Sequence, residues 1–247
     1  MPKSILLSAL AIVSAMLVTA AVFTAFKHAG DSLGVAILAL ALGTYCSDAL
    51  SAVVHFCFDY VIPDRFPILG GVAKSFRDHH DNPILDPGTR PENYAIGATS
   101  AAPLAVLSLT SEYFSQGGQS SHLASMCLAV MAVWGMFFHQ IHAYAHMGSS
   151  VDVAHYGARI DQIVLQHSSR DRRRMLNEMF DGMPIPSFVR ALQRLGILLD
   201  PVRHVSHHRE IDCNFSSVNG WSDALLNPLM RQLVRRFYVT PNFNDSH

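Results

Sequence analysis

The segment His204-Val205-Ser206-His207-His208 places three histidines within five residues. In a helix, residues three and four apart are neighbours, so the three rings would share one side. Imidazole is a borderline ligand that suits iron, copper, nickel and zinc. The segment therefore predicts a metal site on one face of a helix.

Five more histidines extend this prediction. They form an adjacent pair, a pair one helical turn apart, and one that stands alone between apolar residues: His79 and His80, His142 and His146, and His55. Together the eight exceed what one tetrahedral zinc site needs, so they suit two metal ions. We expect no ligand role for the other isolated histidines, which are His28, His122, His155, His167 and His247.

The length indicates one or two domains, and the composition is apolar. Of 247 residues, 50% are hydrophobic and only 15% are charged, below the usual quarter or so. The net charge of -1 does not indicate a nucleic-acid partner. The four cysteines have neither a disulfide framework nor zinc-finger spacing, and three of them lie in apolar runs: Cys46, Cys57, Cys127 and Cys213.

Four apolar runs are about as long as a bilayer requires. They are Ile5 to Phe26, Leu33 to Val61, Tyr94 to Phe114 and Leu123 to His146. The first could also be a cleaved signal peptide, although three similar runs follow it. We therefore predict an all-α integral membrane protein, with four transmembrane helices in residues 1–146. A cytosolic helical cap in residues 147–247 would carry the last histidines.

The second run has a polar face. Asp48, Ser51, His55 and Asp59 recur at helical spacing on one side of it. A carboxylate inside a membrane helix costs roughly 2.5–3.5 kcal/mol, so we expect Asp48 to have a histidine N–H or a metal-bound group as its partner. Alternatively, Asp48 marks the membrane edge. Both carboxylates are candidates for a catalytic role beside the metal ions.

The polar segments between and after the runs complete the set. His79 and His80 are expected in a loop, Pro63 to Glu92, where neighbouring Asp residues could orient ligand rings. Further expected elements are a helix at Phe188 to Leu199, a turn at Asn214 to Asp223 and an amphipathic helix at Leu225 to Tyr238. The arginines of this last helix form either a solvated face or a site for anionic headgroups.

The basic residues predict the topology, because lysine and arginine concentrate on the cytoplasmic side. Four lie between the second and third runs, and twelve arginines follow the fourth run. The other two connections contain only Lys27. Both termini are therefore expected in the cytoplasm. The same topology brings all eight histidines to the cytoplasmic face, although they play no part in the charge count.

Histidine coordination with open positions suits oxygen activation by two irons. Soluble di-iron proteins use Glu and His on bundle helices for this purpose. Two Fe2+ ions with O2 would attack an unactivated C–H bond, and the spans would deliver a membrane phospholipid chain from the bilayer. The sequence has no flavin, haem or Gly-rich dinucleotide motif. Electrons are therefore expected from an external donor protein with its reductase.

These motifs resemble the lipid desaturase family called Kua or CarF-like, which includes the plasmanylethanolamine desaturases. The resemblance rests on Asp48-x-x-Ser51-x-x-x-His55-x-x-x-Asp59, Phe76-Arg77-Asp78-His79-His80-x-x-Pro83, Gln140-Ile141-His142-Ala143-Tyr144-Ala145-His146 and His204-x-x-His207-His208. It covers roughly residues 40–147 and 184–228. It implies a di-iron site on the eight histidines, O2 as co-substrate and a one-electron carrier such as cytochrome b5 or ferredoxin. It also implies conversion of a 1-O-alkyl phospholipid to the 1-O-alkenyl product, the vinyl ether of plasmalogens.

Several positions depart from the family pattern. They are Ala52 and Phe56 in the second run, Ser216 and Asp223 in the late turn, His139 where Asn is usual, and an apparent insertion at residues 148–183. None is one of the eight histidines, so the departures bear on the substrate. We expect His139 to donate or accept a hydrogen bond near the site without binding metal.

Three other functions stay open on the sequence. An acyl-lipid desaturase or hydroxylase would use the same oxidant on a different carbon. A zinc-dependent membrane hydrolase lacks support, because no HExxH motif is present. A non-catalytic metal-binding scaffold would keep the histidines without turnover.

Overall fold

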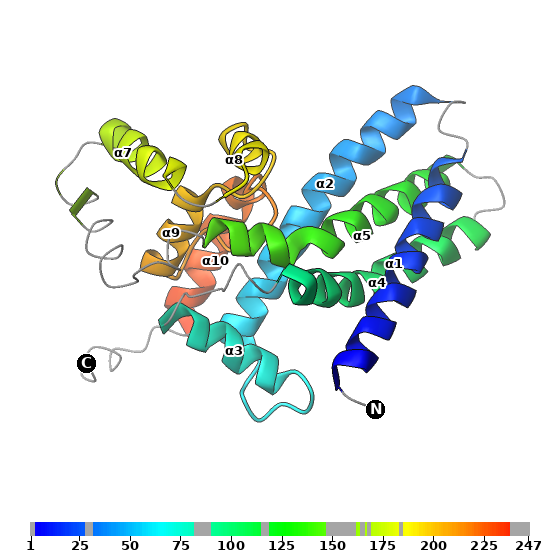
Figure 1. Cartoon of the computed structure of the whole chain (residues 1–247), viewed down its shortest axis with the longest axis horizontal. Coiled ribbons are helices and arrows are strands. Elements are labelled where there is room, and N and C mark those ends of the chain that lie inside the picture. Colours follow the sequence, from blue (N-terminus) through cyan, green and yellow to red (C-terminus); the bar gives the residue numbers. More distant parts are fainter. Residues whose placement is uncertain are drawn as a thin grey trace. The chain divides into compact units, whose positions relative to one another are not determined.

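The computed structural model describes residues 3–27, 32–81, 90–114, 119–146, 162–163, 166, 169–182 and 185–237. Every regular element in these ranges is a helix (Figure 1). They are α1 (Lys3–Phe26), α2 (Leu33–Phe56), the π-helix η2 (Cys57–Val61), α3 (Gly70–Asp81), α4 (Arg90–Phe114), α5 (Gln119–Ala145), α7 (Ser169–Asp181), α8 (Ser187–Arg194), α9 (Pro201–Glu210) and α10 (Asp223–Phe237).

Four helical segments are long and apolar enough to cross a membrane. They are Ile5–Phe26, Leu33–Val61, Pro91–Phe114 and Ser121–Ala145. Between 17% and 28% of the most apolar stretch of each is buried within the chain, so most of their apolar surface is left for lipid. The predicted all-α, multi-pass membrane fold is confirmed.

The chain folds into two compact units that alternate along the sequence. The first unit comprises Met1–Ser47 and Gly88–His142, and the second comprises Asp48–Pro87 and Ala143–His247. Helix α2 therefore begins in the first unit and ends in the second. The predicted boundary at residue 146 remains a prediction.

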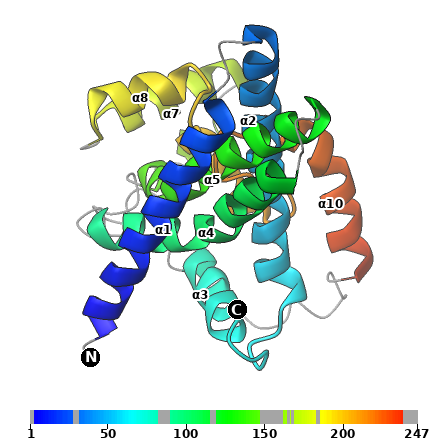
Figure 2. The same ribbon diagram turned by 90° about the vertical axis from the view of Figure 1, so that its right-hand side faces the viewer.

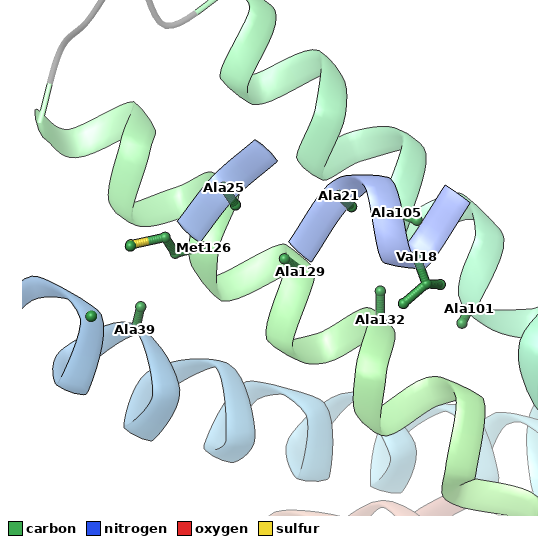
Figure 3. Packing of buried hydrophobic residues seen from close by; sticks show 10 residues of the cluster. Val18, Ala21, Ala25, Ala39, Ala101, Ala105, Met126, Ala129 and Ala132 are labelled. Carbon is green, nitrogen blue, oxygen red and sulfur yellow. The ribbon is translucent and has the colours of Figure 1, made fainter. Parts of the chain in front are cut away.

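Small residues hold the first unit together. Helix α1 crosses α4 and α5 in both views (Figures 1 and 2). Alanines from four helices form the contact surface with Val18 and Met126 (Figure 3): Ala21, Ala25, Ala36, Ala39, Ala101, Ala105, Ala129 and Ala132. Lipid tails are as apolar as leucine, so membrane helices associate through close packing, which small residues permit. Ser108 and Ser125 add buried hydrogen bonds between α4 and α5, each donating to the other's carbonyl oxygen.

The second unit has its own apolar contacts around the end of α2. Ala52 and Phe56 of α2 pack against Phe215 and against Met230 and Val234 of α10. Because these side chains lie on one face of α2, the opposite face of this segment stays exposed, with Leu50, Val53 and Val54 at 40–44% of full accessibility.

Two sequence expectations need correction. His79 and His80 lie in helix α3, not in a loop. An ion pair between Lys74 and Asp78, four residues apart with 2.6 Å between Nζ and Oδ2, stabilises that helix. The helix expected at Phe188 to Leu199 ends at Arg194, because Gly196 adopts φ +69° and donates its N–H to the Gln193 carbonyl, a common helix stop.

We predict that Gly97→Ala weakens the first unit. A β-carbon at Gly97 would lie 2.2 Å from the Met136 carbonyl oxygen, so α4 and α5 must separate to admit it. Overpacking of this kind costs about 1–3 kcal/mol, and the thermal unfolding midpoint in detergent should fall. Gly34→Ala is the matched control, because a β-carbon there meets nothing within 4 Å. Equal midpoints for the two variants would contradict this packing.

Candidate metal centre

Helix α9 presents the last histidine motif as the sequence predicts. Asp200 caps its first turn by accepting the Val202 N–H at 3.1 Å, and Pro201 occupies the first helical position. The helix ends at Glu210, because the next residue, Ile211, has a left-handed φ of 41°. His204 and His207 are fully buried on one side of this short helix, and His208 is partly buried.

Two backbone carbonyls orient rings of the centre. The Nδ1 atom of His207 lies 2.7 Å from the Cys213 carbonyl oxygen. The Nδ1 atom of His55 lies 3.0 Å from the Phe215 carbonyl oxygen. An Nδ1–H donated to a carbonyl fixes the tautomer that leaves Nε2 as a lone-pair donor. Both rings are therefore prepared to bind metal through Nε2.

One potential metal group consists of His55, Asp59, His80 and His207, whose ligand atoms all lie within 4.8 Å of one another. The Nε2 atoms of the three histidines lie 3.5, 3.3 and 3.8 Å from the Asp59 carboxylate, in that order. The Asp59 oxygens and the Nε2 atoms of His80 and His207 are buried, yet none makes a hydrogen bond with a described residue. Lone pairs that converge without hydrogen bonds fit a bound cation.

A second group consists of His79, His146 and His204. Nε2 of His79 lies 2.9 Å from Nε2 of His146, and Nε2 of His204 is in close contact with the same atom. His142 is buried at the end of the first unit, one turn before His146 on α5. The spacing predicts a ligand role for it as well.

His208 lies beside both groups. Its Nε2 atom is 3.1 Å from Nε2 of His204, and its ring centre is 4.7 Å from that of His80 and 4.9 Å from that of His79. Burial, with the nearby imidazoles of His80 and His79, lowers the pKa of His208 to about 2. Burial likewise lowers the pKa of His207. Both rings are therefore neutral near pH 7, as metal ligation requires.

A family model described as the lipid desaturase domain matches residues 44–174, more than half of the chain. The chain belongs to the lipid desaturase family. The match ends before α9, and it contains both carboxylates and five of the eight predicted ligands: His55, His79, His80, His142 and His146. It also runs through residues 148–174, most of the segment expected to be an insertion. No curated protein and no solved structure shows a match.

In this lipid desaturase a π-helical turn positions Asp59. The α-helix α2 ends at Phe56, and Cys57–Val61 continue it as a π-helix. Such turns are rare and often occur at functional sites. Asp59 was predicted as a catalytic carboxylate, and it lies among potential metal ligands. The sequence offers no signal for the change of helix type.

Arg77 joins α3 to the end of this π-helix. Its Nη1 atom donates to the carbonyl oxygens of Phe58 at 2.6 Å and Ile62 at 3.1 Å, and its Nη2 atom pairs with Asp64. A guanidinium can satisfy several carbonyls at a helix end because it has five donors. Because His79 and His80 follow Arg77 by two and three residues on the same helix, this contact helps to fix the position of the helix end that carries them. The sequence identifies Arg77 as part of the Phe76–Pro83 motif but does not predict these contacts.

Asp48 has a different partner from the expected histidine or metal. It is completely buried, and its two oxygens accept N–H groups from Asn219, Gly220 and Ser222 at 2.8–3.0 Å, with the Ser222 hydroxyl at 2.7 Å. Gly220 has φ +81°, and a β-carbon there would lie 2.8 Å from the Arg203 guanidinium. The carboxylate therefore binds the turn after the last histidine motif to α2.

A third group of potential metal ligands consists of Glu210, Asp212 and Cys213. The charges of its two carboxylates are neutralised by an arginine. Arg231 donates to Glu210 at 2.6 Å and to Asp212 at 3.2 Å. Burial raises the pKa of Cys213 to about 11, so its thiol is protonated at neutral pH. This cluster lacks the character of a metal site.

We predict that Asp48→Ala releases the 214–223 turn. Four donors would lose their acceptor, and hydrogen bonds to charged groups are worth about 1.5–3 kcal/mol each. Stability should fall by more than about 3 kcal/mol on that scale, and hydrogen exchange of the amides of Asn219, Gly220 and Ser222 should accelerate. Asp78→Ala, which breaks an exposed ion pair, should cost less than about 1 kcal/mol. Unchanged protection of the turn in Asp48→Ala would refute the role assigned to this carboxylate.

We predict that His139→Asn keeps its metal whereas His142→Asn loses it. His139 belongs to neither group of potential ligands in the described part of the chain, and its ring packs on Phe138, with centroids 4.6 Å apart. Metal per chain, measured by elemental analysis of purified protein, distinguishes the two variants. A metal deficit in His139→Asn would make it a ninth ligand.

Proposed function

We propose that the protein is an O2-dependent di-iron desaturase that converts a 1-O-alkyl phospholipid to its 1-O-alkenyl product. The observation that carries this proposal is the presence of two groups of potential ligands, one of which includes His55 and Asp59 near the end of the second span. Membership of the lipid desaturase family supports the reaction class. The resemblance to the plasmanylethanolamine desaturases supports the ether substrate.

The ligand set favours iron. Imidazole nitrogens with one carboxylate suit iron, whereas zinc has no redox chemistry with which to activate O2. His55, Asp59, His80 and His207 would hold one ion, and His79, His142, His146 and His204 the other, with His208 available to either. When bound, the two irons supply the activation of O2 that hydrogen removal from an unactivated carbon requires.

The electron balance requires an external donor. Reduction of O2 to two waters takes four electrons and four protons. The substrate gives two of each as its two adjacent methylenes become a double bond. The other two electrons come from a one-electron carrier, cytochrome b5 or a ferredoxin, and the other two protons come from water. A cytoplasmic position of the site and of both termini, as the basic residues predict, would give that carrier access.

The depth of the site favours a position near the glycerol end of the chain. At about 1.5 Å per residue, His55 lies roughly 9 Å before Val61, where the second span ends. A site at this level meets the first carbons of a lipid chain rather than its middle. Hydrogen removal beside an ether oxygen is also easier than removal from a plain methylene. Both arguments favour a vinyl ether.

The substrate prediction is tested in a host that lacks plasmalogens. The host expresses the protein and receives an alkylglycerol, and we expect fatty aldehyde after mild acid treatment of its lipids. Vinyl ethers hydrolyse to aldehydes under these conditions, whereas allylic ethers and acyl double bonds do not. His207→Ala, which removes a buried potential ligand, should release no aldehyde above background. His122→Gln, outside both groups, should match the parent.

The other outcomes identify the alternatives. A new double bond or hydroxyl in an acyl chain, without aldehyde, would show an acyl-lipid desaturase or hydroxylase. Full turnover by His207→Ala would exclude the assigned centre. A protein that binds iron but changes no lipid, with a donor supplied, would be a metal-binding scaffold.

A further inference from the structure

A strained turn lies between the second span and the helix that carries His79 and His80. Ile68 has φ +69°, a left-handed conformation that is an outlier for a β-branched residue. The Leu69 N–H donates to the Pro67 carbonyl at 2.8 Å, which closes a γ-turn around Ile68. The Gly70 N–H donates to the Phe66 carbonyl at 2.8 Å and fixes the base of the turn.

The strain directs apolar side chains outward. Ile68 is 95% exposed, and Phe66, Leu69 and Val72 are 39–49% exposed. A glycine would adopt the same backbone without strain, and polar side chains would avoid the cost of exposure. The turn therefore combines a strained backbone conformation with exposed apolar side chains, and both are unfavourable in water. Backbone strain of this kind tends to occur at functional positions, and the exposed side chains here present an apolar surface.

The position of the turn in the chain identifies that surface. The second span runs from Leu33 to Val61, about 43 Å at 1.5 Å per residue, close to the thickness of a bilayer with its headgroups. The chain therefore leaves the helix at headgroup level, and Phe66 follows Val61 by only five residues. Val61 is itself 50% exposed, so the lipid-facing surface of the span continues into the turn.

Basic residues flank the apolar ones. Arg65 immediately precedes Phe66 and is exposed, and Lys74 lies one helical turn after Gly70 with 58% of its side chain exposed. Basic residues around large apolar side chains are typical of segments that lie in the membrane interface. Figure 1 shows this turn as the cyan loop that leads into α3.

We propose that the Phe66–Leu69 turn is a membrane-interface anchor, which inserts Phe66, Ile68 and Leu69 among the lipid headgroups and first acyl carbons. The bilayer that receives them is the one that the second span crosses. Arg65 would contact lipid phosphates. Segments of this kind bury their apolar side chains by about 5–10 Å.

The anchor would fix one end of α3, and Arg77 fixes the other. Arg77 holds the last turns of α3 to the carbonyls of Phe58 and Ile62. The anchor lies at the first turn, where Gly70 begins the helix. Together they would hold His79 and His80 at a set depth relative to the lipid chain. This inference rests on the membrane fold and is independent of the substrate.

Depth-dependent fluorescence quenching tests the anchor. Ile68→Trp is made in full-length protein that also carries Trp134→Phe and Trp221→Phe, and it is reconstituted in phosphatidylcholine and phosphatidylglycerol vesicles. We expect blue-shifted emission and strong quenching by lipids brominated near the headgroup end of the acyl chain. Aqueous iodide should quench weakly. Leu69→Trp provides a second reporter if Ile68→Trp does not fold.

Two reference positions calibrate the result. Met16→Trp, 67% exposed near the middle of the first span, reports the acyl region. Glu178→Trp, on α7 with 69% of its side chain exposed, reports an exposed site outside the spans. Iodide quenching of Ile68→Trp equal to that of Glu178→Trp overturns the proposal. Protection of Ile68→Trp from both quenchers overturns it as well, because the turn would then be covered by protein.

Discussion

A completely buried carboxylate near the middle of α2 governs the second unit. Asp48 binds the N–H groups of a turn more than 170 residues later in the chain. Taking a carboxylate out of water is costly unless several donors compensate it, and the 219–222 turn supplies four. The turn supplies the donors that stabilise the buried carboxylate, and the carboxylate is the acceptor that holds the turn in place. Ser51, one turn further along α2, accepts the Ser217 N–H at 3.0 Å and extends the same attachment.

The geometry of the candidate metal centre depends on this attachment. The segment bound to Asp48 also supplies the carbonyls of Cys213 and Phe215, which orient His207 and His55. Tyr60 adds a hydrogen bond of 2.7 Å to the Ile211 carbonyl. Backbone carbonyls can orient imidazoles only where the backbone itself is held rigidly. The hydrogen bonds of Asp48 therefore fix the segment whose carbonyls align His207 and His55, two potential metal ligands.

Much of this arrangement could be predicted from the sequence, because it depends on local periodicity. The spans follow from their apolar length, and the side of α9 that carries His204, His207 and His208 follows from helical spacing. The γ-turn at Ile68 and the π-helix at Asp59 could not be predicted, since neither has a distinctive composition. The partner of Asp48 was missed because backbone N–H groups leave no trace in the side-chain pattern. The sequence predicts a loop for His79 and His80 because nearby Pro and Gly residues conceal the helix between them.

The alternation of the two units along the chain has a consequence for biosynthesis. His55 and its carbonyl partner at Phe215 are 160 residues apart, and two membrane spans are made between them. All four spans are therefore synthesised before α9 and the turn that orients the rings. Contacts this distant in sequence form late, because a long loop must close first. The spans are thus made before the centre can form, and a metal ion would bind only after the turn that orients His207 and His55 has closed on α2.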